Sequence, residues 1–153
     1  MKIFDFNEQL IEGQETERFL DSIFSKFVRI QDVEMDLQTK GVDRIFYWDD
    51  MAIAVEYKAD RRATITGNAF IEIISVSHTN KAGWAKTTNA DWIIYFLPQE
   101  MKAYVVRVKE MRQKLDEWLN TYPTGTAQNE EYQSIGILVP LTELEKCGKI
   151  MCL

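Results

Sequence analysis

The chain has few of the residues that build disulfide frameworks or imidazole metal sites. Its 153 residues include two cysteines and one histidine. Cys147 and Cys152 are too few for a disulfide framework or a zinc site, so a reducing cytoplasm is the expected setting. The amino terminus also lacks the charged and apolar regions of a signal peptide. No apolar run approaches the roughly 20 residues that a membrane-spanning helix needs, so we expect no membrane partner.

Positive charge is unevenly distributed in a chain that is acidic overall. Its 46% apolar and 27% charged residues are typical of a soluble globular protein, and its length predicts one domain over residues 1–153. The net charge of −6 argues mildly against a nucleic-acid partner. Residues 1–37, however, hold four basic and nine acidic side chains, whereas residues 58–86 hold five basic and two acidic ones. The basic side chains therefore gather in the middle of the chain.

Residues 41–72 have the most informative pattern in the sequence. They predict a β-hairpin, then a loop marked by a glycine, and then a third apolar run. Apolar and polar residues alternate in AIAVEYK, which pairs with DRIFYW across an Asp49-Asp50 turn. A two-residue turn places Asp43 opposite Glu56, and a four-residue loop places it opposite Lys58. Both registers put these three polar side chains on one face of the sheet.

Carboxylates that face each other across two strands repel and lower stability. A divalent cation between Asp43 and Glu56 would remove this penalty, and Lys58 would then complete a site that handles phosphate. The alternative is that these residues are solvated polar side chains on the outer face of an amphipathic hairpin. Spacing alone does not separate the two interpretations.

The same residues resemble the PD-(D/E)XK nuclease superfamily, whose signature is an acid followed by (Asp/Glu)-x-Lys. Asp43 and Glu56-Tyr57-Lys58 carry that pattern. The segments TGNAFIE, at 66–72, and GWAKTTNADW, at 83–92, are similar to those of small phage-type members. The resemblance covers residues from about 15 to 97. It implies an α/β fold with a restriction-endonuclease-like αβββαβ core, in which helices flank a mixed central sheet.

The resemblance implies a metal-dependent endonuclease that hydrolyses phosphodiester bonds in DNA. Asp43 and Glu56 would bind Mg²⁺, with Mn²⁺ able to substitute, and the backbone carbonyl of Tyr57 would be an additional ligand. A metal-bound water would attack the phosphorus, while Lys58 would orient it and offset charge on the phosphate oxygens. We therefore count Asp43, Glu56 and Lys58 as catalytic.

Two further glutamates are candidates for a second metal or for positioning water. Glu72 lies among apolar neighbours, where a carboxylate is unfavourable unless it is paired or metal-bound, so we also count it as catalytic. Glu17 lies at the border of the apolar stripe of the first expected helix, and superfamily members often direct a first-helix glutamate into the site. The alternative for Glu17 is an ordinary acid near a helix N-terminus.

The expected contacts to nucleic acid come from the basic middle of the chain and would bind the DNA backbone without reading sequence. They are Arg61, Arg62, Asn68, Lys81 and Lys86. Because the chain is short, it has little room for a separate recognition domain. A homodimer or a protein partner could supply specificity for the DNA substrate. Two other functions stay open. One is a nuclease-fold DNA-binding or assembly protein without turnover, and the other is an α/β interaction module.

The remaining pattern predicts a mixed α/β sandwich. Helical spacing indicates a helix over 12–27, with Phe27 on its apolar stripe. Strands are expected within 28–33, 69–78, 103–106 and 133–140, and a strand buried on both faces over 91–98. A helix follows the strand at 103–106, residues 122–132 form a loop, and 141–147 a short helix.

Overall fold

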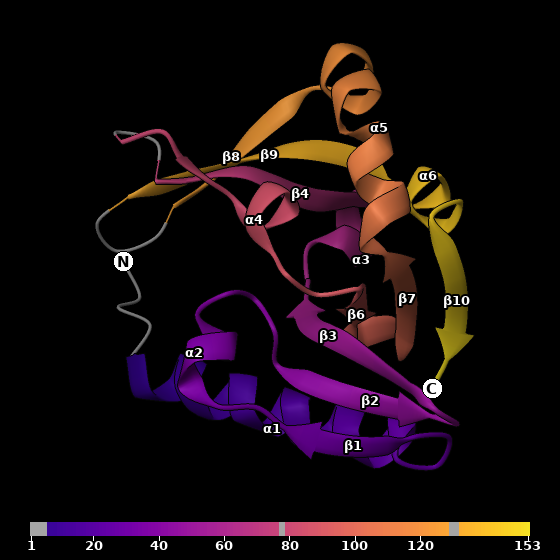
Figure 1. The fold of residues 1–153 in the computed structure, drawn as a ribbon. Helices are drawn as coiled ribbons and strands as arrows, with labels where there is room; N and C mark the ends of the chain where they lie inside the picture. The colour runs from indigo at the N-terminus through magenta and orange to yellow at the C-terminus, as the bar shows by residue number, and fades with distance from the viewer. Residues whose placement is uncertain (1–5, 77–78, 129–131) are drawn as a thin grey trace.

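The computed structural model describes residues 6–76, 79–128 and 132–153, with side chains from residue 12 onward. These residues form a mixed α/β fold with two β-sheets (Figure 1). The helices are α1 (Phe6–Phe24), α2 (Met35–Gln38), α3 (Ala63–Thr66), α4 (Trp84–Thr87), the 3-10 helix η1 (Pro98–Glu100), α5 (Val108–Thr121) and α6 (Leu141–Glu145). The strands are β1 (Arg29–Asp32), β2 (Arg44–Trp48), β3 (Met51–Ala59), β4 (Asn68–Val76), β5 (Lys81–Ala82), β6 (Trp92–Leu97), β7 (Lys102–Arg107), β8 (Thr124–Gln128), β9 (Gln133–Pro140) and β10 (Gly148–Cys152).

The larger sheet is mixed and has six strands in the order β1-β2-β3-β6-β7-β10. Its neighbours are antiparallel except β3 and β6, which run parallel. A parallel pair needs a long crossover connection, and here α3, β4, β5 and α4 lie within it. β6 is a central strand, and every residue from Ile93 to Leu97 is buried. The prediction of a strand covered on both faces is confirmed.

The smaller sheet has the order β5-β4-β9-β8, with antiparallel neighbours throughout. Together with α5 and α6 it covers one face of the larger sheet, and Figure 1 shows it above the end of β3. Ile71 of β4 and Ile137 of β9 share a core with Ile93 of β6 and Trp118 of α5. This shared core fixes the position of the smaller sheet relative to the strands that carry the proposed site.

Helix α1 covers the opposite face of the larger sheet. Leu20 and Phe24 on its apolar side pack with Phe46, Val55 and other residues of the central strands. This stripe was expected from the sequence, and it holds the polar border of α1 beside the start of β2. The helix ends at Phe24, and the chain turns before β1, so the side chain of Phe27 is 66% exposed instead of buried.

Several expectations about the elements were wrong. The first helix spans residues 6–24 and not 12–27, and only 29–32 of the expected strand at 28–33 is extended. Part of the expected loop at 122–132 is the edge strand β8, and β10 was not anticipated. Strand β4 begins at residue 68, one residue before the expected start. It belongs to the smaller sheet, so the larger sheet is covered by a second sheet as well as by helices. The last two residues of the expected strand at 69–78 lie outside the described residues.

Among the residues that the structure describes, no helix is long and apolar enough to cross a bilayer.

Candidate active site

A two-residue turn sets the register of the β2–β3 hairpin. Trp48 pairs with Met51 and Arg44 pairs with Val55, so Asp43, directly before β2, stands across from Glu56. This is the first of the two registers expected from the sequence. The backbone N–H of Asp43 donates to the carbonyl of Val55 at 2.8 Å, which keeps Asp43 at the edge of the sheet.

The carboxylate of Asp43 reaches along β3 and accepts a 2.7 Å hydrogen bond from the N–H of Tyr57. The N–H and the carbonyl of one residue point to the same side of a strand, so the carbonyl of Tyr57 is directed towards the same edge. The expected backbone ligand therefore lies next to the first expected carboxylate. The phenol of Tyr57 instead faces α1, where its hydroxyl donates to Asp21 at 2.7 Å.

Asp43 lies in an environment that disfavours its charged form. Burial raises its pKa from 3.8 to about 6, and repulsion from Glu17 and Glu56 adds to the rise. The hydrogen bond from Tyr57 and attraction to Lys58 lower the pKa without cancelling the increase. Four of the side chains named from the sequence, Glu17, Asp43, Glu56 and Lys58, are therefore near enough to interact electrostatically with one another through Asp43.

Glu56 is a buried acid whose two oxygens differ. The residue is 5% exposed, and its Oε1 atom lies 2.9 Å from the ammonium of Lys58. Its Oε2 atom is buried and has no hydrogen-bond partner among the described residues. Buried carboxylate oxygens are normally bonded, because losing water without a replacement costs about 1–3 kcal/mol or more for a charged group. Oε2 is thus positioned to accept a cation or a donor.

The wall beside Oε2 is made by the loop before β2 and the segment after α4. Gly41 has a φ of +85°, and a Cβ there would lie 2.5 Å from Thr88 Oγ1 and 3.2 Å from Glu56 Oε2. The Thr88 hydroxyl donates to the carbonyl of Gly41 and accepts from the N–H of Ala90. A few residues on, the carboxylate of Asp91 accepts a hydrogen bond from the N–H of Ala54 on β3. These residues of the GWAKTTNADW segment therefore connect the wall to β3 and to the loop before β2.

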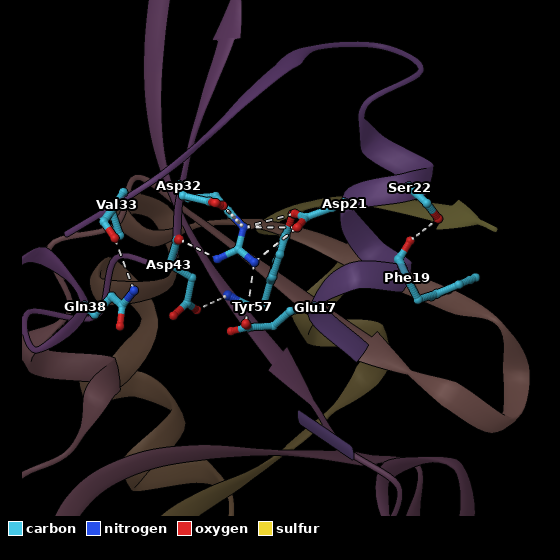
Figure 2. Close-up of polar contacts among 10 residues, drawn as sticks. Glu17, Phe19, Asp21, Ser22, Asp32, Val33, Gln38, Asp43 and Tyr57 are labelled. Carbon is cyan, nitrogen blue, oxygen red and sulfur yellow. Dashed lines mark hydrogen bonds and ion pairs between the residues drawn. The ribbon is translucent and has the colours of Figure 1, made fainter. Parts of the chain in front are cut away.

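Arg44 is the centre of an ionic network that the sequence analysis missed. Its guanidinium contacts Asp21 at 3.1 Å, Asp32 at 3.3 Å and Glu17 at 3.5 Å. It also donates to the backbone carbonyl of Asp43 at 2.8 Å. Figure 2 shows these carboxylates arranged around the guanidinium, with Glu17 and Asp43 lying to the same side of it. Arg44 therefore connects the border of α1 to the strand end that carries Asp43.

Glu17 lies on α1, and its carboxylate pairs with Arg44 at 3.5 Å. Its side chain is 36% exposed, and its charge contributes to the raised pKa of Asp43. The signal in the sequence for this network is the pair Glu17 and Asp21, which lie four residues apart on the polar border of one helix.

Glu72 lies on the smaller sheet and is half-buried. Its carboxylate accepts a 3.3 Å hydrogen bond from the N–H of Trp84, and the ring centroid of Trp84 lies 5.4 Å from the Lys58 ammonium. Glu72 therefore supports the residue beneath Lys58, and among the described residues no hydrogen bond or ion pair joins it to Asp43 or Glu56. Gly83 permits this arrangement, because a Cβ there would lie 2.5 Å from the carbonyl oxygen of Glu72.

The five expected nucleic-acid contacts occupy different places. Arg62 and Asn68 line a cleft of about 390 Å³ together with Lys58. Arg61 pairs with Glu12 and lines a separate hollow beside Glu17. The other two residues, Lys81 on β5 and Lys86 on α4, are exposed.

The donor set matches the chemistry of a hard divalent cation. Carboxylates from Asp43, Glu56 and Glu17 and a backbone carbonyl from Tyr57 are all oxygen donors, which Mg²⁺ and Mn²⁺ prefer. Among the described side chains, no group of three or more acids, histidines or cysteines is arranged so that it could hold a metal ion. The bare buried oxygen of Glu56 and the raised pKa of Asp43 nevertheless fit a site in which a cation offsets the clustered negative charge.

No family model, curated protein or solved structure matches the chain.

Proposed function

We propose that this protein is a metal-dependent endonuclease that hydrolyses phosphodiester bonds in DNA. The observation that carries the proposal is the convergence of Asp43, Glu56 and Lys58 at one sheet edge, where a buried carboxylate oxygen lacks any described partner. Solvated polar residues on an outer hairpin face would not show this burial. Here Glu56 is buried and Asp43 is half-buried.

The order of the elements supports the proposal. Helix α1 precedes three antiparallel strands, β1, β2 and β3, and the later pair α4 and β6 brings a strand parallel to β3. With α2 counted as an insertion between β1 and β2, and α3, β4 and β5 as insertions before α4, this order is compatible with the αβββαβ core that we propose. In this order Asp43 precedes the second strand and Glu56-Tyr57-Lys58 ends the third.

The residues that would hold Mg²⁺ or Mn²⁺ are Asp43, Glu56 and the carbonyl of Tyr57, with Glu17 able to join them if it leaves Arg44. When bound, the cation supplies Lewis-acid activation of water and neutralisation of charge at the phosphate. Glu72 accepts a hydrogen bond from Trp84 and forms none with the other acids among the described residues, so we assign it a supporting role and not a place among the ligands.

Lys58 is the residue assigned to the phosphate. Its ammonium is held between the Oε1 atom of Glu56 and the ring of Trp84, at the border of the cleft. An ammonium fixed in this way stabilises negative charge that builds on phosphate oxygens during hydrolysis. Arg62 and Asn68 on the same cleft would hold neighbouring parts of the DNA backbone.

The test is nicking of supercoiled plasmid DNA by purified protein with Mg²⁺, Mn²⁺ or a chelator. Nicking should require the cation and should fall about 10²–10³-fold in Lys58→Ala, because a fixed cation at the developing charge is removed. Lys109→Ala, an exposed position on α5 away from the cleft, is the matched control and should nick as the wild type does. Thermal melting of both variants shows whether the fold survives.

The competing function is a DNA-binding or assembly protein that has the nuclease fold without turnover. The ion pair between Lys58 and Glu56 is the observation that favours this alternative, because the pair would stabilise the fold of an inactive protein as well. DNA binding with no metal-dependent nicking by the wild-type protein would establish this alternative and refute the endonuclease.

A further inference from the structure

The cleft beside Lys58 lies between the end of β3 and the smaller sheet. It is bordered on one side by Lys58 and Arg62 and on the other by Thr126 of the edge strand β8. Its volume of about 390 Å³ falls within the roughly 300–1,000 Å³ typical of small-molecule sites. Figure 1 shows the end of β3 below this sheet, with α4 nearby.

Aromatic side chains form much of the cleft wall. Trp84 and Phe70 line it, and both are half-buried, so part of each ring is open to a ligand. The ring of Phe70 is held by Gly136 on β9, where an added Cβ would lie 2.8 Å from ring atoms. The backbone N–H of Trp84 donates to Glu72, and the centroid of its ring lies 5.4 Å from the Lys58 ammonium. These contacts restrict both aromatic residues of the wall.

Polar groups suited to a nucleotide lie around the aromatic wall. The carboxamide of Asn68 has no hydrogen-bond partner among the described residues, so its donors and acceptor are available to a base edge. Arg62 makes no ion pair with any described residue, and Lys58 adds a second cation for phosphate. The one acid on the cleft, Asp60, is already engaged by the Tyr95 hydroxyl and by two backbone N–H groups.

We propose that this cleft binds one unpaired nucleotide of the DNA substrate, with its base against Trp84 and Phe70 and its phosphate near Lys58 and Arg62. A base inside a duplex has both faces covered by its neighbours, so it cannot lie against these rings without leaving the stack. Extraction is least unfavourable where a base is already unpaired. The substrate class that follows is single-stranded DNA, or a duplex with an unpaired nucleotide beside the cut, and this inference rests on the proposed endonuclease.

Two variants of β8 test the cleft without touching the acidic cluster. Ala127→Trp places a large side chain on the face of β8 that Gly125 and the cleft residue Leu138 share, whereas Thr124→Trp places the same side chain on the opposite, exposed face of the same strand. Binding of a fluorescent thymidine oligonucleotide in the presence of a chelator should weaken in Ala127→Trp and stay as in the wild type in Thr124→Trp. Equal binding by both variants would overturn the proposal.

Trp84 gives an independent readout of stacking. Trp84→Leu should weaken oligonucleotide binding by roughly 5- to 150-fold, the range of one base stacked on an aromatic ring. Trp84→Phe should recover part of the loss, which a merely structural role for the indole would not predict. No loss in Trp84→Leu, measured on protein that melts as the wild type does, would refute the assignment.

Cleavage of matched substrates separates this inference from the proposed function. The wild-type protein with Mn²⁺ should cut a single strand, or a duplex with one unpaired thymidine, faster than the fully paired duplex. Equal cutting of all three would refute the cleft proposal and leave the endonuclease intact. Oligonucleotide binding that Ala127→Trp weakens, without cutting of any substrate, would support the cleft and refute the endonuclease.

Discussion

Replacing Asp43 by asparagine should stabilise the folded protein near neutral pH. Burial, then repulsion from Glu17 and Glu56, raises the pKa of Asp43 from 3.8 to about 6. The folded state therefore holds the proton more tightly than the unfolded chain does. Through this group, the free energy of unfolding falls as pH rises from about 4 to about 6 and stays lower above that range.

The size of the effect follows from the shift. About two pKa units correspond to about 3 kcal/mol, and because Asp43 is only partly buried, solvent screening reduces this to about 1–2 kcal/mol. The carboxamide in Asp43→Asn would keep an oxygen able to accept from the N–H of Tyr57 while removing the charge. The gain in this variant should therefore appear near neutral pH and vanish near pH 4.

Urea unfolding followed by tryptophan fluorescence, in a chelating buffer, measures the difference between variant and wild type at each pH. Asp116→Asn, at an exposed position on α5, is the matched control and should show no comparable dependence on pH. If Asp43→Asn is no more stable than the wild type near neutral pH, the raised pKa of Asp43, caused by burial and then by the neighbouring carboxylates, is refuted.

Three further predictions concern the surroundings of Asp43. Adding Mg²⁺ should raise the melting temperature of the wild type and not that of Glu56→Gln, because the ion binds only the folded site and needs this carboxylate. Arg44→Ala should lower the free energy of unfolding by about 2–3 kcal/mol in urea, because its acidic partners lose their shared cation. Gly41→Ala should lower it by about 1–3 kcal/mol, because the residue combines a φ of +85° with contact to Thr88.

A different result would contradict each of these three predictions. An equal Mg²⁺ response in Glu56→Gln would place the ion elsewhere. Full stability in Arg44→Lys would contradict the role of the planar guanidinium, which contacts several carboxylates at once. Gly13→Ala, in α1 with nothing within 4 Å of the added Cβ, should be neutral or stabilising. A comparable loss there would show that the cost at Gly41 is not specific to its position.

The sequence was sufficient to predict the hairpin part of the site. Side chains alternate along a strand, so Asp43, Glu56 and Lys58 had to share a face once the turn had an even length. The apolar stripe of α1 was predicted because its spacing matches only a helix. β6 was predicted because a short, continuous apolar run is typical of a buried strand.

The remaining features depend on contacts between segments far apart in the chain. Arg44 gave no local signal, since its partners Asp21 and Asp32 come from α1 and the end of β1. β8 has the sequence TGTAQ, which shows no apolar alternation, and it forms by pairing with β9. Glu72 was singled out because a carboxylate among apolar residues is unusual, but the sequence did not show that the N–H of Trp84, twelve residues further on, donates to it.

The most direct test of the central claim is a crystal soaked in Mn²⁺ and measured at a wavelength where manganese scatters anomalously. The account predicts an anomalous peak between the carboxylates of Asp43 and Glu56, within about 2.5 Å of oxygens from both. A crystal with Mn²⁺ bound at other carboxylates and no peak between these two would contradict it.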